Sequence, residues 1–399
     1  MPDALPCSFF PPFPRGKKER CLLDPRFKAY ADLLVGHSVK VKPGDVTVIE
    51  IFDEIPEMMA RATVDAVQRA GGVPIVWLRR QRVTHDLLRY TKPEALEATL
   101  KTMAANDLAV MRRAQCYIAL RGYANASEMA GVSPNVMKLY GRLYNSPVHL
   151  KCRIPKTRWV VNRWPSPSMA QMAKKSTADF EDFFFACTTG VDYVAMAKAA
   201  RPLVALMKRT NKVHIVGPGD TDLIFSIKGI PAIPCFGEHN IPDGECFTAP
   251  VRTSMNGVIE YNTPTICQGA YFEGLRFVVR DGQIVEATCR VGDVSRLNAI
   301  LDTDPGARYF GEFALGFNPA VDKIMCDTLF DEKRRESFHL TPGNSYDEAP
   351  NGNKSAVHWD IVAVQLGKDA IYFDGVLVRR GGLFVPKYLK GLNPDRLMA

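Results

Sequence analysis

The sequence of 399 residues lacks the features that mark membrane and secreted proteins. No stretch approaches the roughly 20 consecutive apolar residues that a membrane-spanning helix needs, so we expect no membrane partner. The first residues, MPDALPCSFFPPFPRGKK, have no basic region ahead of their apolar residues and are interrupted by proline. This pattern is not that of a secretory signal, and we therefore expect a cytoplasmic location.

Disulfide and zinc-finger patterns are also missing. The ten cysteines are scattered, and none forms a C-x-x-C pair. Without a signal for an oxidising compartment, we expect reduced and mostly buried thiols.

Several familiar catalytic signatures are absent as well. There is no Walker A loop, no H-E-x-x-H and no G-x-S-x-G. The segment Gly217-Pro-Gly219 resembles a phosphate-binding loop only superficially, because the third glycine is missing and two nearby aspartates would repel a phosphate. We interpret it as a turn at the end of a strand.

Positive charge is in excess, with a net charge of +8 and a pI near 8.9. The densest basic stretch contains no acidic residue and comprises Lys151, Arg153, Lys156, Arg158 and Arg163. Because no nucleic-acid-binding motif accompanies it, we expect no nucleic-acid partner. The stretch is interpreted as a solvated face or a lining that attracts anionic groups.

The first half of the chain alternates helical and strand patterns. Helical periodicity covers residues 24–37, 56–70, 94–113 and 177–186, and apolar strand patterns cover residues 46–52, 73–78 and 116–120. Strands that alternate with helices predict an α/β N-terminal domain with a mostly parallel sheet. We place this domain at residues 1–200.

The second half contains many short strands. They are predicted at residues 212–216, 257–261, 275–279 and 282–288, and a further pair at 357–366 and 370–378. Asp281-Gly282 between two apolar runs predicts a hairpin. The pattern indicates an α+β C-terminal catalytic domain, rich in antiparallel strands, over residues 201–399.

The segment around His358 and Asp360 is the first to suggest chemistry. On a strand, alternate side chains share a face, so these two would point the same way. Nitrogen and oxygen ligands of this kind suit zinc, manganese, cobalt or iron. A hydrogen-bonded structural pair is the alternative interpretation.

Other candidates lie in the same half of the chain. His339 and Tyr346 belong to the run FHLTPGNSY, and both Glu245 and Glu312 are flanked by glycine and apolar residues. A carboxylate in apolar surroundings is costly unless it is paired or bound to a cation. Taken singly, each glutamate could also be a surface residue.

Taken together, these segments resemble the thermophilic-type metallo-aminopeptidase family of aminopeptidases T and S. The resemblance covers most of the chain and is densest after residue 210. It rests on the ordered phrases NIPDGECFTAP (240–250), DTDPGARYFGEFALG (302–316), DTLFDE (327–332), FHLTPGNSY (338–346) and HWD (358–360).

The resemblance implies a set of site residues. The family's metal ligands fall on Glu245, Glu312, His339, His358 and Asp360, and its active-site tyrosine falls on Tyr346. It also implies a fold with an N-terminal α/β domain and a C-terminal catalytic domain. Family members are similar in forming homodimers, so a homodimer is expected.

Five ligands exceed what one tetrahedral zinc site takes, so we expect two divalent ions, zinc, cobalt or manganese, that share a carboxylate. Glu312 is our choice for the shared ligand. The expected reaction is removal of the N-terminal residue from peptides with a free N-terminus. Tyr346 would donate a hydrogen bond to the tetrahedral intermediate or support a ligand, and Glu273 is a guess for the general base.

Two other functions compete with this one. His339, His358 and Asp360 could form the triad of a mononuclear Fe(II) ring-cleaving dioxygenase, a class that includes dihydroxypyridine dioxygenases. A single-iron site would not need both Glu245 and Glu312. A non-catalytic binding protein with an inherited fold would predict a degraded ligand set, whereas all six positions hold the expected residue type.

Overall fold

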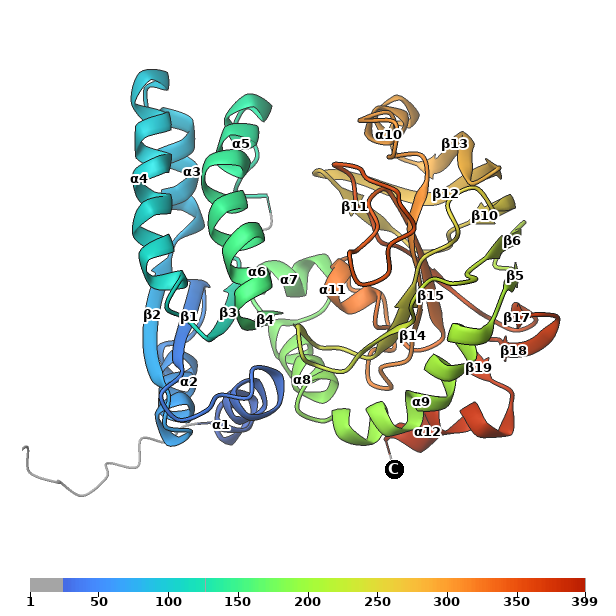
Figure 1. Cartoon of the computed structure of the whole chain (residues 1–399), viewed down its shortest axis with the longest axis horizontal. Helices are drawn as coiled ribbons and strands as arrows, with labels where there is room; N and C mark the ends of the chain where they lie inside the picture. Colours follow the sequence, from blue (N-terminus) through green and yellow to red (C-terminus); the bar gives the residue numbers. More distant parts are fainter. Residues whose placement is uncertain (1–23, 126, 399) are drawn as a thin grey trace, which may run out of the picture.

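A computed structural model of the chain describes residues 24–125 and 127–398. Within these ranges the strands form three sheets, one parallel and two antiparallel. Figure 1 shows the parallel sheet with its helices on one side of the molecule and the antiparallel sheets on the other. The expected fold class, α/β followed by α+β, is therefore confirmed.

The parallel sheet is built from the strands predicted in the first half of the chain, plus one short strand from the second half. Its order is β2-β1-β3-β4-β8, and every neighbouring pair is parallel. The strands are β1 (Val46–Asp53), β2 (Val73–Arg79), β3 (Cys116–Gly122), β4 (Arg158–Arg163) and β8 (Asn240–Ile241).

Helices cover both faces of this sheet because successive side chains of its strands point to opposite sides. Ile49 of β1 belongs to the core that includes α1 and α2, and its neighbour Val48 belongs to the core that includes α4 and η2. The helices of this part are α1 (Pro25–Asp32), η1 (Leu33–Ser38), α2 (Glu57–Arg69), α3 (Gln81–Tyr90), α4 (Pro93–Met111), α5 (Pro134–Tyr140), η2 (Gly141–Arg153), α6 (Ile154–Lys156), α7 (Pro167–Met172) and α8 (Thr177–Cys187).

The larger antiparallel sheet has the order β11-β12-β10-β6-β5-β17-β18-β19, with β13 paired to β12. Its strands are β5 (Lys212–Val216), β6 (Asp222–Ser226), β10 (Asn256–Glu260), β11 (Thr265–Cys267), β12 (Ala270–Arg280), β13 (Gln283–Val291), β17 (Ala370–Phe373), β18 (Val376–Arg380) and β19 (Leu383–Phe384). The predicted hairpin joins β12 to β13, and both Asp281 and Gly282 have the positive φ that a type I′ turn demands.

The smaller antiparallel sheet has the order β16-β15-β14-β9-β7. Its strands are β7 (Ile233–Cys235), β9 (Glu245–Thr248), β14 (Phe310–Gly316), β15 (Ser337–Pro342) and β16 (Ile361–Val364). The remaining helices are α9 (Tyr193–Arg209), α10 (Val294–Leu301), α11 (Thr328–Asp331), η3 (Lys387–Leu392) and α12 (Pro394–Leu397).

One predicted strand pair is wrong. Residues 361–364 form β16, which pairs with β15 in the smaller sheet, whereas residues 370–373 form β17 in the larger sheet. The partner of β17 is β18, across a turn in which Asp374 and Gly375 both have positive φ. An Asp-Gly dipeptide between two apolar runs therefore forms a second hairpin of the kind predicted at 281–282.

The two parts of the chain are not cleanly separated in sequence. Strand β8 from the second half extends the parallel sheet, and residue 200 lies inside α9. The domain boundary near residue 200 stays a prediction. None of the helices in the described ranges has the length and apolar character needed to cross a membrane.

Candidate metal centre

Three of the predicted ligands lie on one face of the smaller antiparallel sheet, as its register requires. Glu245 of β9 is opposite Gly316 of β14, and His339 of β15 is opposite Ala314. Residues directly opposite each other share a face, as do residues two apart on one strand. Glu312, Ala314 and Gly316 therefore place both glutamates and His339 on the same face.

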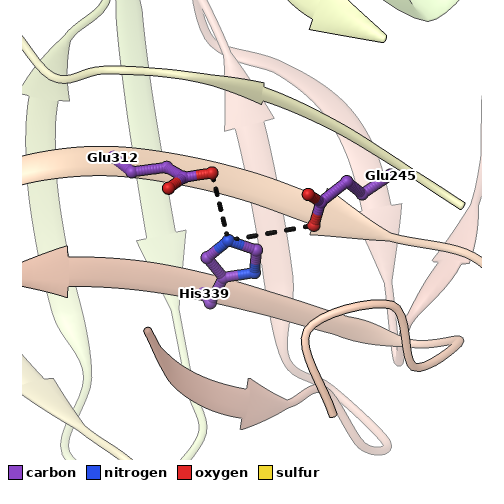
Figure 2. A group of neighbouring side chains, drawn as sticks. All are labelled: Glu245, Glu312 and His339. Atoms are coloured by element: carbon purple, nitrogen blue, oxygen red, sulfur yellow. Dashed lines mark hydrogen bonds and ion pairs between the residues drawn. The ribbon is translucent and has the colours of Figure 1, made fainter. Parts of the chain in front are cut away.

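The three side chains meet over the centre of the sheet (Figure 2). The Nε2 atom of His339 lies 3.4 Å from Oε1 of Glu312 and 3.8 Å from Oε2 of Glu245. All three residues are buried, with at most 4% of their surface exposed. Two carboxylates in such a place need a cationic partner, because an unpaired buried charge is strongly unfavourable.

His358 and Asp360 complete the cluster from just before β16. Nε2 of His358 lies 3.3 Å from Oδ1 of Asp360 and 3.4 Å from Oε2 of Glu312. The expectation that this segment is a regular strand is wrong, since β16 begins at Ile361 and His358 makes only an isolated bridge to Gly343. The two side chains nevertheless converge as alternation predicts.

The absence of a side chain at Gly343 explains this local shape. A Cβ atom there would lie 2.1 Å from the carbonyl oxygen of Val357, so only glycine permits so close an approach. Gly343 also has φ of +107°, a conformation that other residues rarely adopt. The segment that carries His358 is thereby held close to the end of β15.

Further hydrogen bonds orient these two predicted ligands. Nδ1 of His358 donates to the carbonyl oxygen of Asn344 at 2.9 Å, so Nδ1 carries a proton and Nε2 faces the cluster. The hydroxyl of Thr341 donates to Oδ1 of Asp360 at 2.6 Å. Metal-binding histidines and carboxylates are commonly held by contacts of this type.

The electrostatics show a site that attracts positive charge. Burial alone would lower the pKa of His339, but the hydrogen bond with Glu312 and the neighbouring carboxylates raise it to about 9. Burial would also lower the pKa of His358, but the negative charge of Asp360 outweighs burial and raises the pKa of His358 above its ordinary value. Burial would raise the pKa of Glu312, but its two histidine partners bring it below the ordinary value.

The donor set fits divalent metal ions. Nε2 of His358 and Oε2 of Glu245 are buried and accept or donate no hydrogen bond, and both belong to the cluster. Atoms of the five predicted ligands form two groups that lie close enough to hold a cation: Glu245, Glu312 and His339 in one, and Glu312, His358 and Asp360 in the other. Nitrogen and carboxylate oxygen are donors suited to zinc, cobalt and manganese.

The model of the thermophilic metalloprotease family (M29) matches residues 23–378. The chain belongs to this family. The resemblance predicted from the sequence is confirmed, and membership of the metalloprotease family implies a divalent metal.

Curated relatives of this M29 chain are aminopeptidases. Aminopeptidase T of Thermus thermophilus is 33% identical over 204 residues, which are 44% of this chain and 49% of that protein. The chain thus spans about half the length of the first relatives that it matches. Aminopeptidase PepS of Streptococcus thermophilus is 21% identical over 388 residues, which are 88% of this chain and 93% of PepS.

Solved structures share the fold. Wild-type AmpT from Thermus thermophilus superposes with a TM-score of 0.77 at 22% identity, covering 91% of this chain and 99% of AmpT. The 2,5-dihydroxypyridine dioxygenase of Pseudomonas putida KT2440 has a TM-score of 0.57 at 14% identity, covering 92% and 98%. At these identities the likeness shows the fold alone, whereas the family is shown by the match to the M29 model.

Tyr346 lies at the edge of the cluster. Its ring centroid is 4.6 Å from that of His358 and 5.5 Å from that of Phe247, and 42% of the residue is exposed. Tyr346 is thus partly open to solvent and lies beside a predicted ligand. Its role in the reaction stays a prediction.

Glu273, the guess for a general base, is engaged elsewhere. It lies on β12, where it accepts a hydrogen bond from Tyr271 and pairs with Arg290 at 2.8 Å. It belongs to neither of these two candidate groups. Nor does it belong to a third candidate group among the described residues, which is formed by Glu332, His339 and Asp360.

Two residues of the site were missed from the sequence. Glu332 joins His339 and Asp360, and it ends the phrase DTLFDE that carries part of the resemblance. Lys333 is buried, and its ammonium group pairs with Glu245. The phrase could have indicated Glu332, whereas no spacing in the sequence indicates that Lys333 meets a residue 88 positions away.

Proposed function

We propose that the chain is a metallo-aminopeptidase that hydrolyses the N-terminal residue from peptides at a two-metal site. The proposed ligands are those of the two groups above, with Glu312 as the shared one. The observation that carries the proposal is the division of Glu312 between two histidines: Oε1 lies 3.4 Å from His339, and Oε2 lies 3.4 Å from His358. One carboxylate with its two oxygens directed at two donor groups suits a pair of ions.

Each residue would have a defined task. Glu245 and His339 would hold one ion, His358 and Asp360 the other, and Glu312 both. Divalent ions bound at this place would supply Lewis acidity for activating a water molecule and for stabilising an oxyanion. Tyr346 would donate a hydrogen bond to the developing charge on the peptide carbonyl. Glu332, which the cluster places beside His339 and Asp360, replaces Glu273 as our candidate for accepting a proton.

Removal of metal tests this function directly. Exhaustive chelation should abolish release of N-terminal residues from a panel of fluorogenic aminoacyl substrates, and added zinc, cobalt or manganese should restore it. Full activity in protein shown by mass spectrometry to be free of metal would end the proposal. A count of one iron per chain would instead favour the dioxygenase.

Metal binding should tighten as pH rises. In the metal-free site the pKa of His339 is raised to about 9, so the ring is protonated at neutral pH, and a cation must displace that proton. Between pH 6 and pH 9 the logarithm of the association constant should rise by about one per pH unit for each displaced proton. Competition titrations with a chelator of known pH dependence would measure the slope, and a flat profile would contradict the assignment.

The stability of the metal-free protein should change in the opposite direction. The folded pKa of His339 lies above its unfolded value of 6.5, so the stabilisation is fully present below pH 6.5 and is lost as pH rises toward 9. Thermal melts in chelator at pH 6 and pH 9 would show this as a lower Tm at pH 9. Metal-loaded protein should lack this loss.

A further inference from the structure

Lys333 is an unusual residue for the interior of a protein. Only 2% of its surface is exposed, and a buried ammonium group is unfavourable unless carboxylates surround it. Its Nζ atom lies 2.5 Å from Oε1 of Glu245, 2.8 Å from Oε1 of Glu332 and 3.7 Å from Oδ1 of Asp243. It is therefore a fixed positive charge beside the proposed metal centre.

Lys333 reaches this place beside Gly316, the last residue of β14, which has no side chain. Gly316 is directly opposite Glu245, and a Cβ atom there would lie 2.5 Å from the carbonyl oxygen of Glu332 and 2.6 Å from that of Arg334. The backbone around Lys333 thus occupies the space that a side chain at 316 would fill. A hydrogen bond at 2.9 Å from the backbone amide of Asn318 to the carbonyl oxygen of Lys333 fixes the segment.

The contact with Lys333 divides the two oxygens of Glu245. Oε1 accepts from Lys333, whereas Oε2 has no hydrogen-bond partner and lies 3.8 Å from Nε2 of His339. Figure 2 shows that a single oxygen of Glu245 is directed at the imidazole. An ion held by this group would meet that oxygen, because the other is occupied by an ammonium group.

We propose that Lys333 is a positioning residue of the metal centre: it restricts Glu245 to one ligating oxygen, and its charge weakens cation binding while favouring ionisation of the attacking water. The inference rests on the proposed function and deepens it. A positive charge near the centre opposes the binding of further cations and stabilises a negative charge formed beside them. Lys333 therefore lowers the affinity of the centre for metal ions and raises the reactivity of the attacking water.

Three variants separate the charge from the hydrogen bond. Lys333→Met removes both, Lys333→Gln keeps a donor for Glu245 without the charge, and Lys333→Arg keeps both. Lys354→Met is the matched control, because Lys354 is 68% exposed and pairs with an exposed aspartate. Each variant is loaded with zinc and tested for metal affinity by chelator competition, for kcat and KM, and for the pH dependence of kcat.

The expected results differ from those of a merely structural lysine. Lys333→Met should keep two ions and bind them about tenfold more tightly, while kcat falls by roughly 10–100-fold with little change in KM. The acidic limb of its kcat profile should move up by about one pH unit or more. Lys333→Gln should show the same shift, and the exposed control Lys354→Met should stay within about threefold of wild type. Lys333→Arg keeps the charge, so it should keep the wild-type pH profile even if its larger side chain lowers kcat.

Several outcomes would overturn the inference. One is weaker metal binding in both Lys333→Met and Lys333→Gln when circular dichroism shows both to be folded. Another is a wild-type kcat and pH profile in Lys333→Gln. If Lys333→Met does not fold, Lys333→Gln and Lys333→Arg decide alone. Failure of the proposed function is distinguishable, since the wild-type protein itself would then lack two ions or peptidase activity.

Discussion

Glu312→Ala is expected to lose both metal ions and to lower kcat/KM by about 10³-fold or more. Glu312 is common to the two groups of proposed ligands, so its removal would take a ligand from each. Losses on this scale follow when a group that acts mainly in the transition state is removed. Metal content after extensive dialysis, measured by mass spectrometry, and steady-state kinetics on the same samples would check the result.

Two further variants make this test specific. Glu312→Gln keeps the volume of the side chain but offers only one oxygen, so it should also fail to hold two ions while remaining folded. Glu286→Ala is a control, because Glu286 lies on β13 with a side chain 59% exposed. Two ions per chain in Glu312→Gln would refute the sharing of Glu312, even if activity were low.

Regular elements of the fold followed from local patterns. The strand predicted at 212–216 is β5 (Lys212–Val216), and the helix predicted at 94–113 is α4 (Pro93–Met111). These patterns suffice because side-chain periodicity and turn residues act over a few positions. The prediction at 357–366 failed because β16 pairs with the strand before it, β15, rather than with the strand that follows it, and the local apolar pattern does not choose between these two neighbours.

The residues of the candidate site also differ in how far local sequence patterns could predict them. His358 and Asp360 meet as expected although they precede the strand, since two residues so close in the chain need no distant pairing to converge. The meeting of Glu245, Glu312 and His339 depends on strand register across β9, β14 and β15, which spacing along the chain does not specify. The resemblance to a family supplied these three, and the burial of Lys333 came only from the structure.

Gly316→Ala should damage the site without touching a proposed ligand. The added Cβ would lie 2.5 Å and 2.6 Å from the backbone oxygens of Glu332 and Arg334, and backbone atoms cannot turn aside as a flexible side chain can. Overpacking of this kind costs about 1–3 kcal/mol. The segment that carries Glu332 and Lys333 must move away from Glu245, so we expect a lower Tm and a kcat reduced by roughly 10–100-fold.

Gly141→Ala is the matched control for this substitution. Gly141 has φ of −54° and ψ of −47°, and no atom lies within 4 Å of its ideal Cβ position. Alanine fits there without strain and should leave activity unchanged while adding about 0.4–1 kcal/mol of stability. If Gly316→Ala matched this control in Tm and kcat, the close approach of the 332–334 backbone to β14 would not be what shapes the site. If kcat of Gly316→Ala fell by more than the loss of stability accounts for, the geometry of Glu332 and Lys333 would matter for the reaction itself.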